Sequence, residues 1–547
     1  MKEEAVSSVT EFAPPVDRSA ALDEVHTGHI NGALGTIQHG DIAPRTGWGA
    51  RLKTLLAILG PGLIVMVGDN DAGAFGTYTQ AGQDYGTTLL WTLALLIPVL
   101  YVNQEMVLRL GAVSGVGHAR LILERFGRFW GAFSVIDLFL LNALTIVTEF
   151  IGISLALDYL GLPKLWGVLV AAALIMMAAT TGSFRRFERF SLVLVFGSLL
   201  LVPVFLMVHP PAGQIAADFL LPKLPKGGQL NEVVLLIIAI VGTTVAPWQL
   251  FFQQSYVIDK RITPRFIHYE RADLWIGILF VMIGAVAMMA LTAATFAGQP
   301  EFGQFNDAGG VASGLEKYVG YFPAILFALA LLDACIIGAS AVSLATAYAV
   351  SDLLDLRHSL HRKPTEAKAF YAVYCGLIAL AAALVLTPGT PLGLLTNAVQ
   401  TLAGVLLPSA TVFLLLLCND KAVLGPWVNG RWLNLFTGGV IVILVLLSMI
   451  LTASVLFPEL GSTTIIAVLG GGSVTALGIY LFSRSSGSVE PVAMSDRNTW
   501  RMPPLAELPP RPLMALNRVW LLVLRTYLVV AAGLVLVRIV NLAMNGV

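Results

Sequence analysis

Two aspartates interrupt an uncharged apolar run near the start of the chain, and they are the residues best placed to do chemistry. Residues 55–67 carry no charge, and residues 68–73 then read Gly-Asp-Asn-Asp-Ala-Gly. A charge deep in a bilayer costs at least about 2.5–3.5 kcal/mol. Glycine lets the backbone leave helical geometry, and carbonyls freed in this way are tolerated only where they line a cavity. The pattern predicts a membrane helix broken at a cation site; the alternative is a kinked helix whose Asp69 and Asp71 pair with a neighbour.

A second interruption lies in residues 241–255, which read VGTTVAPWQLFFQQS. Pro247 lacks a backbone donor and clashes with the preceding turn, so we expect the helix to kink or unwind there. Two interrupted segments at matching positions of two halves indicate an inverted-repeat transporter with its site between them. An incidental proline kink is the alternative, and the carboxylates at the first break argue against it.

The elements that position both breaks are expected to be membrane helices. Of the 547 residues, 57% are hydrophobic and only 12% are charged, whereas soluble chains have about 25% charged residues. The apolar residues gather in runs of roughly 20, which is long enough to cross a bilayer. The expected helices cover 54–82 (broken near 69–73), 87–113, 131–159, 165–181, 190–208, 232–258, 273–297, 322–353, 369–388, 391–418, 434–456 and 463–483, and a last run at 516–543 either spans the membrane or lies in its interface.

Basic residues in alternate loops orient this bundle. The rich loops hold Arg120, Arg125, Arg128, Arg185, Arg186, Arg189, Lys260, Arg261, Arg265, Arg271, Arg357, Arg362, Lys363 and Lys368, and the poor loops hold Lys164, Lys223, Lys226 and Lys317. The positive-inside rule therefore places the rich loops and the N-terminus in the cytoplasm of a multi-pass protein in the cell membrane.

The chain divides into six expected parts. They are a disordered cytoplasmic tail (1–50), a first repeat of five helices (51–210), a second repeat of five (211–425), two further helices (426–483), a cytoplasmic linker (484–515) and a terminal apolar helix (516–547). Three cysteines without metal-type spacing suggest buried thiols. The formal net charge of zero gives no pull toward nucleic acid, so the expected partners are the bilayer and a small solute, and we expect a monomer.

Several motifs then resemble one family. GPG at 60–62 followed by DAGAFGTYTQAGQDYG is similar to the first helix of the Nramp divalent-metal transporters, GPG…DPGNFATDIQAGAEYG. Further similar stretches are NQEMVLRLGAVSG (103–115), TEFIG (148–152), VAPWQLFFQQS (245–255), the segment 326–354 and the segment 406–425. The resemblance implies an all-α polytopic membrane protein with the five-plus-five inverted repeat of the amino acid–polyamine–cation superfamily, and extra C-terminal helices.

The resemblance implies site residues and also shows departures from the family pattern. Asp71 matches the family's liganding aspartate, and Gln400 matches a liganding glutamine of helix 10. Ala74 stands where the family has a liganding asparagine. Ala246 replaces the methionine whose thioether contacts the metal, and Trp248 replaces the neighbouring histidine.

Two further family positions concern the proton route. Gln253 stands at the second histidine of helix 6. In helix 3 the family's TD…E pattern becomes Thr145-Ile146…Glu149, so one carboxylate is missing and Glu149 remains.

The departures change the expected cargo. A soft thioether favours Mn, Fe and Cd over hard cations, so its loss removes a means of rejecting Mg²⁺. The expected oxygen donors are Asp71, Gln400, Gln249 and the carbonyls of Gly68 and Thr243, with Asp69 beside them. The small Ala74 and Ala246 leave room for a partly hydrated ion, because Mg²⁺ usually keeps several waters. We therefore expect Mg²⁺ and Mn²⁺ as transported substrates, as in the Nramp-related magnesium transporters, with no cofactor.

The histidines bear on coupling. All eight lie in the tail, in loops or at expected helix ends, so no buried histidine is expected to relay protons. We therefore predict passive, proton-independent influx, for which a divalent ion gains about 4.6 kcal/mol per 100 mV.

Four candidate pathway residues have two interpretations each. Glu149 either faces the aqueous path or pairs with Arg109, and Asp69 either touches the ion or lines the vestibule. Trp248 is a gate or a packing residue, and Gln253 solvates the path or joins helices through hydrogen bonds.

Three other functions stay open. They are proton-coupled Mn²⁺/Fe²⁺ transport of the ordinary Nramp kind, organic-solute transport, and a non-transporting scaffold or sensor. An enzyme is not expected, because the sequence has no P-loop, nucleophile elbow or metal-spaced His/Cys cluster.

Overall fold

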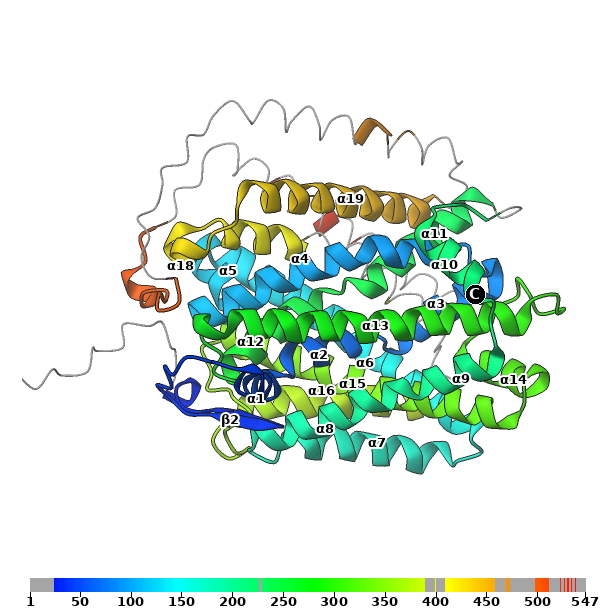
Figure 1. The fold of residues 1–547 in the computed structure, drawn as a ribbon, viewed down its shortest axis with the longest axis horizontal. Coiled ribbons are helices and arrows are strands. Elements are labelled where there is room, and N and C mark those ends of the chain that lie inside the picture. The colour runs from blue at the N-terminus through cyan, green and yellow to red at the C-terminus, as the bar shows by residue number, and fades with distance from the viewer. Residues whose placement is uncertain are drawn as a thin grey trace, which may run out of the picture.

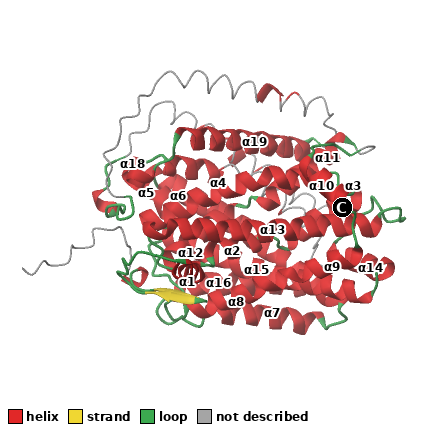
Figure 2. Cartoon of the chain, in the orientation of Figure 1, coloured by secondary structure: helices red, strands yellow, loops and turns green. Residues whose placement is uncertain are grey.

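The computed structural model is a bundle of long helices that lie side by side, with one small hairpin at one end (Figures 1 and 2). It describes residues 24–225, 229–388, 399, 409–457, 467, 470–472 and 497–510, and single helical residues between 522 and 537. The expected helix 463–483, the terminal run 516–543 and the start of 391–418 fall mostly outside these residues.

The helices have the following bounds. They are α1 (Trp48–Ile58), α2 (Pro61–Val67), α3 (Ala72–Tyr85), α4 (Leu90–Ser114), α5 (His118–Phe126), α6 (Arg128–Tyr159), α7 (Lys164–Ala179), α8 (Phe184–Gly197), α9 (Leu201–Val208), α10 (Ala212–Leu220), α11 (Leu230–Thr244), α12 (Pro247–Asp259), α13 (Ile267–Phe296), α14 (Ala308–Tyr318), α15 (Tyr321–Leu353), α16 (Lys368–Leu386), α18 (Lys421–Leu424) and α19 (Arg431–Leu456). A further helix covers Ser409–Cys418.

Length and composition support the membrane assignment. Within the described residues, eight helices are long and apolar enough to cross a membrane, or ten if each of two bent helix pairs is one span. In Figure 1 α19 and α7 lie along opposite edges of the bundle, while α13 and α15 lie between them. The central helices pack closely: a Cβ at Gly62 would lie 2.7 Å from the backbone of Leu274, so α2 and α13 meet at their backbones.

The first expected break is present and is double. α1 and α2 meet at 53° across Leu59 and Gly60, whose φ of 154° favours glycine. The helix stops again after Val67, and α3 begins at Ala72 with Asp71 as its N-cap. Asp71 Oδ1 accepts a hydrogen bond of 3.0 Å from the Ala74 backbone N–H, which is the usual role of an aspartate at a helix start.

The second expected break is also present. α11 ends at Thr244 and α12 begins at Pro247, where a missing backbone donor costs nothing because the first turn has no intrahelical acceptor for it. Ala246 has extended backbone angles between the two helices. Both interruptions therefore bring non-helical backbone into the interior of the bundle.

The expected disordered tail is wrong for residues 24–50. Residues Glu24–His26 form a short 3-10 turn, and β1 (Ile30–Gly32) pairs antiparallel with β2 (Gly35–Ile37). Apolar side chains of this hairpin are buried against the bundle, which gives the segment an energetic reason to fold. We call residues 24–45 the N-terminal strap, and the face of the bundle it covers the strap face.

A C-terminal segment covers the same end of the bundle. The Met502 backbone N–H donates to the Val113 carbonyl at 3.2 Å, and the Arg497 guanidinium lies 4.5 Å from the centre of the Trp427 ring. Residues 497–510 therefore form an ordered part of the expected linker 484–515.

Candidate functional site

A cavity of about 310 Å³ reaches Asp71 at the first helix break. Its other lining residues are Gly73, Leu141, Thr145, Thr148, Leu235, Ile238, Ala239, Gly242, Thr243, Ala246, Pro247, Trp248, Val399, Leu451 and Ser454. The volume is several times the roughly 30 Å³ that one water occupies in the liquid. Both helix breaks contribute to its lining, so the cavity joins the two positions that the sequence singled out.

The cavity extends away from the strap. Leu235 and Ile238 lie early in α11, which continues through α12 to Asp259 beside the strap, and Leu451 and Ser454 lie near the end of α19. The Asp71 carboxylate is thus approached from the face opposite the strap.

Asp71 and Glu149 form one unit at the end of this cavity. Glu149 on α6 is fully buried, and its Oε2 accepts a hydrogen bond of 3.1 Å from the Ala72 backbone N–H. Asp71 lies beside it, since a Cβ at Gly338 on α15 would be 3.0 Å from Asp71 Cβ and 2.9 Å from Glu149 Oε2. Glycine at this position is what lets α15 approach the pair.

The predicted Glu149–Arg109 alternative is wrong. Arg109 instead pairs with Glu105 at 3.2 Å and donates to Asn429 Oδ1 at 2.6 Å.

Asp69 and Gln249 lie at a second, deeper level. Neither is among the residues that line the cavity, and both are fully buried. Gln249 Nε2 donates to Asp69 Oδ1 at 2.5 Å, and Gln104 Nε2 on α4 donates to Gln249 Oε1 at 3.0 Å. Asp69 Oδ2 has no hydrogen-bond partner within the described part of the chain. The structure therefore separates Asp69 from Asp71, which the sequence had placed in one site.

The remaining predicted residues fall into three groups. Thr243, Ala246 and Trp248 line the cavity. Ala74 is buried on α3, and its backbone N–H donates to the capping side chain of Asp71. Gly68 is the C-cap of α2, where its N–H bonds to the Ile64 carbonyl at 2.9 Å. Gln400 lies outside the described residues.

Gln253 neither lines the cavity at Asp71 nor forms a side-chain hydrogen bond with Asp69 or Gln249 within the described residues. It is fully buried on α12, and neither atom of its amide has a hydrogen-bond partner in the described ranges. Burying an amide without a partner costs free energy, and the described contacts give no compensation for it at this position.

Sequence reasoning missed Gln104 and a hydroxyl pair behind the breaks. Tyr78 and Thr244 are 2.6 Å apart, oxygen to oxygen, and fully buried, so they tie α3 to the end of α11. The only signal for them in the sequence was a polar residue on a helix expected to pack against the carboxylate. His118 lies at a helix end as expected, since it is the first residue of α5, but it has no exposed surface and its Nδ1 lies 2.8 Å from Gln254 Oε1.

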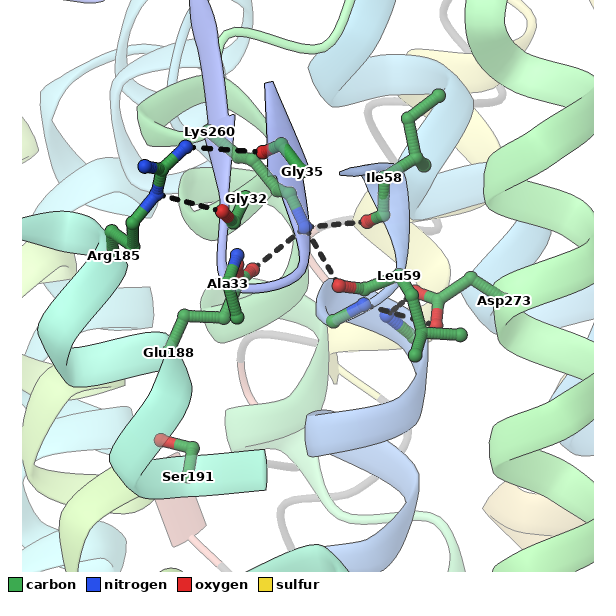
Figure 3. Close-up of polar contacts among 12 residues, drawn as sticks. Gly32, Ala33, Gly35, Ile58, Leu59, Arg185, Glu188, Ser191, Lys260 and Asp273 are labelled. Carbon is green, nitrogen blue, oxygen red and sulfur yellow. Dashed lines mark hydrogen bonds and ion pairs between the residues drawn. The ribbon is translucent and has the colours of Figure 1, made fainter. Parts of the chain in front are cut away.

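The strap face is closed by a buried ion pair (Figure 3). Lys260 Nζ lies 2.7 Å from Glu188 Oε1 and donates to the carbonyls of Ile58 and Leu59 at the end of α1. Asp273 accepts hydrogen bonds from the backbone N–H groups of Gly60 and Gly62 at 3.1 and 2.7 Å. Lys260, which the sequence analysis counted among the loop charges, is therefore a buried structural cation.

The donors at the first break are carboxylate, hydroxyl and backbone oxygens. No group of three or more His, Cys, Asp or Glu residues with metal-site geometry occurs among the described residues, so any ion here keeps part of its water shell or draws on amide and carbonyl oxygens. Such a set suits a transiently held divalent cation better than a structural metal.

Comparisons with known proteins agree with this arrangement. Residues 62–454 match the family described as natural resistance-associated macrophage protein-like, Nramp. The divalent metal cation transporter MntH of Xylella fastidiosa (strain 9a5c) is 29% identical over 464 residues, which cover 80% of this chain and 92% of that protein. The MntH of Ralstonia nicotianae is 30% identical, and the match covers 69% and 86% of the two chains.

A solved structure has the same fold. The crystal structure of the Eremococcus coleocola manganese transporter, in complex with an aromatic bis-isothiourea substituted compound, aligns with a TM-score of 0.62 at 20% identity. The alignment covers 83% of this chain and 97% of that one. The expected all-helical polytopic fold is thereby confirmed.

Proposed function

The chain belongs to the Nramp family of divalent metal transporters, and from this premise we propose that it imports Mn²⁺ by alternating access with Asp71 as its central ligand. The observation that carries the proposal is the cavity that ends on Asp71 between the two helix breaks. As a member of a transporter family it is not an enzyme.

Mn²⁺ as cargo is supported by the relatives. MntH proteins are named as divalent metal cation transporters, and the fold neighbour is named as a manganese transporter. Mn²⁺ accepts oxygen ligands, so the Asp71 carboxylate and nearby hydroxyl and carbonyl groups suit it even without a thioether.

A proton is proposed to travel with the ion, which reverses the expectation of proton-independent transport. The buried carboxyl groups of Asp71 and Glu149 lie close together and repel each other when both are ionised, and a divalent cation arriving at Asp71 competes with a proton that relieves this repulsion. Release of that proton toward the strap face would couple the proton flux to the flux of the metal ion. The buried His118, 2.8 Å from Gln254, also removes the argument that the bundle interior lacks histidine.

Mg²⁺ remains a second candidate cargo for a specific reason. Ala246 lines the cavity where a thioether would disfavour hard cations, and the cavity is wide enough for an ion with several waters. The magnesium-transporter assignment rests on these two features alone.

The two levels of polar groups suggest the order of events. The ion first meets Asp71 in the open cavity, while Asp69, Gln249 and Gln104 stay sealed beneath it. Since the strap face is closed, the structure fits the state that is open to the opposite side. Positive-inside loops make that opposite side extracellular.

The test is uptake into proteoliposomes that carry a metal-sensitive dye and a pH dye. We expect Mn²⁺ influx with acidification of the lumen, and loss of influx by at least about tenfold in Asp71→Asn, since a primary ion ligand contributes more than 1.4 kcal/mol. Asp333→Asn is the matched control, because it removes another carboxylate within the bundle that does not line the cavity.

Three results would contradict parts of this proposal. Mn²⁺ influx unchanged in Asp71→Asn would reject the site. Influx without acidification, in wild type and in Glu149→Gln alike, would reject proton coupling and restore the passive mechanism. Mg²⁺ influx that Mn²⁺ does not inhibit would reject a shared site.

A further inference from the structure

We propose that the N-terminal strap is a latch that locks the strap face shut and must leave its seat before the ion can exit there. This inference rests on the proposed transport function only for the direction of ion exit. The latch itself follows from the contacts of residues 24–45.

The hairpin of the strap is held by two arginines of α8, of which Figure 3 shows Arg185. Arg185 Nε donates to the Gly32 carbonyl at 2.9 Å, and its Nη2 donates to the Gly35 carbonyl at 3.2 Å. Arg189 Nε donates to the Ala33 carbonyl at 3.1 Å. Arg185 Nη2 also donates to the Thr36 hydroxyl, so the two guanidiniums hold the hairpin through three backbone carbonyls and one side chain.

Two more arginines hold the flanks of the strap after α12. Arg261 donates to the carbonyls of Val25 and His29 at 2.9 and 3.1 Å. Arg265 donates to the carbonyls of residues 41, 42 and 43 at 2.9, 2.6 and 2.9 Å. His26 Nε2 also lies 3.7 Å from Asp259 Oδ1 at the end of α12, so the strap is bound by α8, by the end of α12 and by the turn that follows it.

The same hairpin sits on α1. A Cβ at Gly32 would overlap the Ala57 carbonyl, and a Cβ at Gly35 would lie 3.0 Å from the Ala57 Cβ. The Ala33 N–H donates to Glu188 Oε2 at 2.5 Å, while the other oxygen of this carboxylate holds Lys260. The strap therefore joins α1 to α8 through the carboxylate that closes the strap face.

The strap contacts hold α1 in place, and the position of α1 controls whether an ion can leave on the strap face. α1 lies across the end of the bundle and is joined to α2 by the Gly60 turn, which can act as a hinge. The polar groups of the deeper level, Asp69 and Gln249, lie on the elements that follow α1 and α11. An exit on the strap face requires α1 to move away from α8 and α12, and the strap binds all three.

The seat of the strap is also incompletely packed. A cavity of about 60 Å³ lies between His26, Thr27 and Gly28 of the strap and residues at the ends of α4 and α12. Detachment of the strap exposes the core side chains of Ile30, Ala33 and Ile37 but leaves the helices packed against one another, and a latch needs a local opening of this kind.

The experiment uses full-length protein in which Cys335, Cys375 and Cys418 are replaced by alanine and Ile58→Cys is the reporter. Ile58 is fully buried beside Lys260. Gly32→Ala should unseat the hairpin from α1, and the double variant Arg185→Ala/Arg189→Ala should unseat it from α8. Gly49→Ala is the matched control, because a Cβ at Gly49 meets open space.

We expect both unseating variants to raise the rate at which a water-soluble maleimide alkylates the reporter by about fivefold, because the closed population falls. Maximal Mn²⁺ influx should rise as well, and Gly49→Ala should match the parent in both measurements. A strap that only stabilises the fold predicts slower influx and no gain in alkylation, and that result would overturn the latch. Alkylation is measured without Mn²⁺, so failure of the transport assignment would leave this test intact.

Discussion

Ala246 stands at the second helix break, where its side chain lines the cavity beside Asp71. It is the residue at which this chain departs most plainly from a soft-metal site. A carboxylate and hydroxyl groups without sulfur hold Mn²⁺ and Mg²⁺ by similar chemistry, so the side chain at this one position is expected to set selectivity.

Ala246→Met should therefore shift preference toward soft ions. We expect the ratio of Cd²⁺ to Mg²⁺ influx to rise about tenfold, the factor that 1.4 kcal/mol of differential binding produces. The measurement is competition of each ion against Mn²⁺ uptake in proteoliposomes. Ala239→Met, a second substitution on the cavity wall but seven residues earlier and within α11, controls for lost volume. Equal ratios in the two variants would show that the thioether does not reach the ion.

At the scale of elements, one buried cation joins three helices. Lys260 binds Glu188 of α8 and two carbonyls of α1, and all the atoms concerned are shielded from solvent. Removing one partner of a buried pair leaves a charge without compensation, whereas removing both often costs little.

Lys260→Met should lower the stability of the detergent-solubilised protein by about 3–5 kcal/mol. The double variant Lys260→Met/Glu188→Met should recover at least half of that loss, and thermal unfolding of the three proteins gives the comparison. Equal losses in the single and double variants would mean that the carbonyl contacts, and not the ion pair, hold α1.

The turn after α15 is fixed by a histidine whose charge depends on pH. Burial lowers the pKa of His358, but the Asp352 carboxylate, 3.2 Å from its Nε2, outweighs burial and raises that pKa to about 9. Because the folded-state value lies above the unfolded value near 6.5, the stabilisation is complete below about pH 6.5 and is lost as the pH rises through 9.

The melting temperature of wild type should therefore fall more between pH 7 and pH 10 than that of His358→Phe. The difference corresponds to at most about 3 kcal/mol, because each pKa unit equals 1.36 kcal/mol. His39→Gln, at an exposed strap position, should behave like wild type. Parallel pH profiles for wild type and His358→Phe would show that this pair does not stabilise the fold.

For the whole molecule, the sequence predicted the architecture well. Runs of apolar residues located the helices, and glycine, proline and buried carboxylates located both breaks, because these signals are local. The strap was not predictable in this way. Its partners on α8 and after α12 lie between 149 and 236 residues away in the sequence. The strap is bound mainly through its backbone carbonyls, and these leave no pattern in the residue types.

The candidate site was predicted in part for the same reason. Asp71, Thr243 and Ala246 line one cavity because each belongs to a break, and their roles at the ion stay predictions. The separation of Asp69 from Asp71 depends on which way each side chain turns within the break. The partnership of Glu149 with the Ala72 N–H depends on how α6 packs, and neither can be read from spacing.

The orientation of the whole molecule remains a prediction that labelling can test. Leu34 on the strap and Phe302 in the loop after α13 are both exposed and lie at opposite ends of the bundle. In intact cells, a membrane-impermeant maleimide should label Phe302→Cys and not Leu34→Cys in the cysteine-free protein. The reverse pattern would invert the proposed direction of transport.

The long range of the strap contacts has a consequence for how the protein is made. Residues 24–45 leave the ribosome first, but their seat is complete only after Arg265 has been synthesised. At roughly 5–20 residues per second this takes about 10–50 s, during which α1 enters the membrane with no strap docked upon it. Docking is thus a late step of biogenesis, and a nascent chain stalled within its first 250 residues would present an unsecured α1 to the quality-control machinery of the cell.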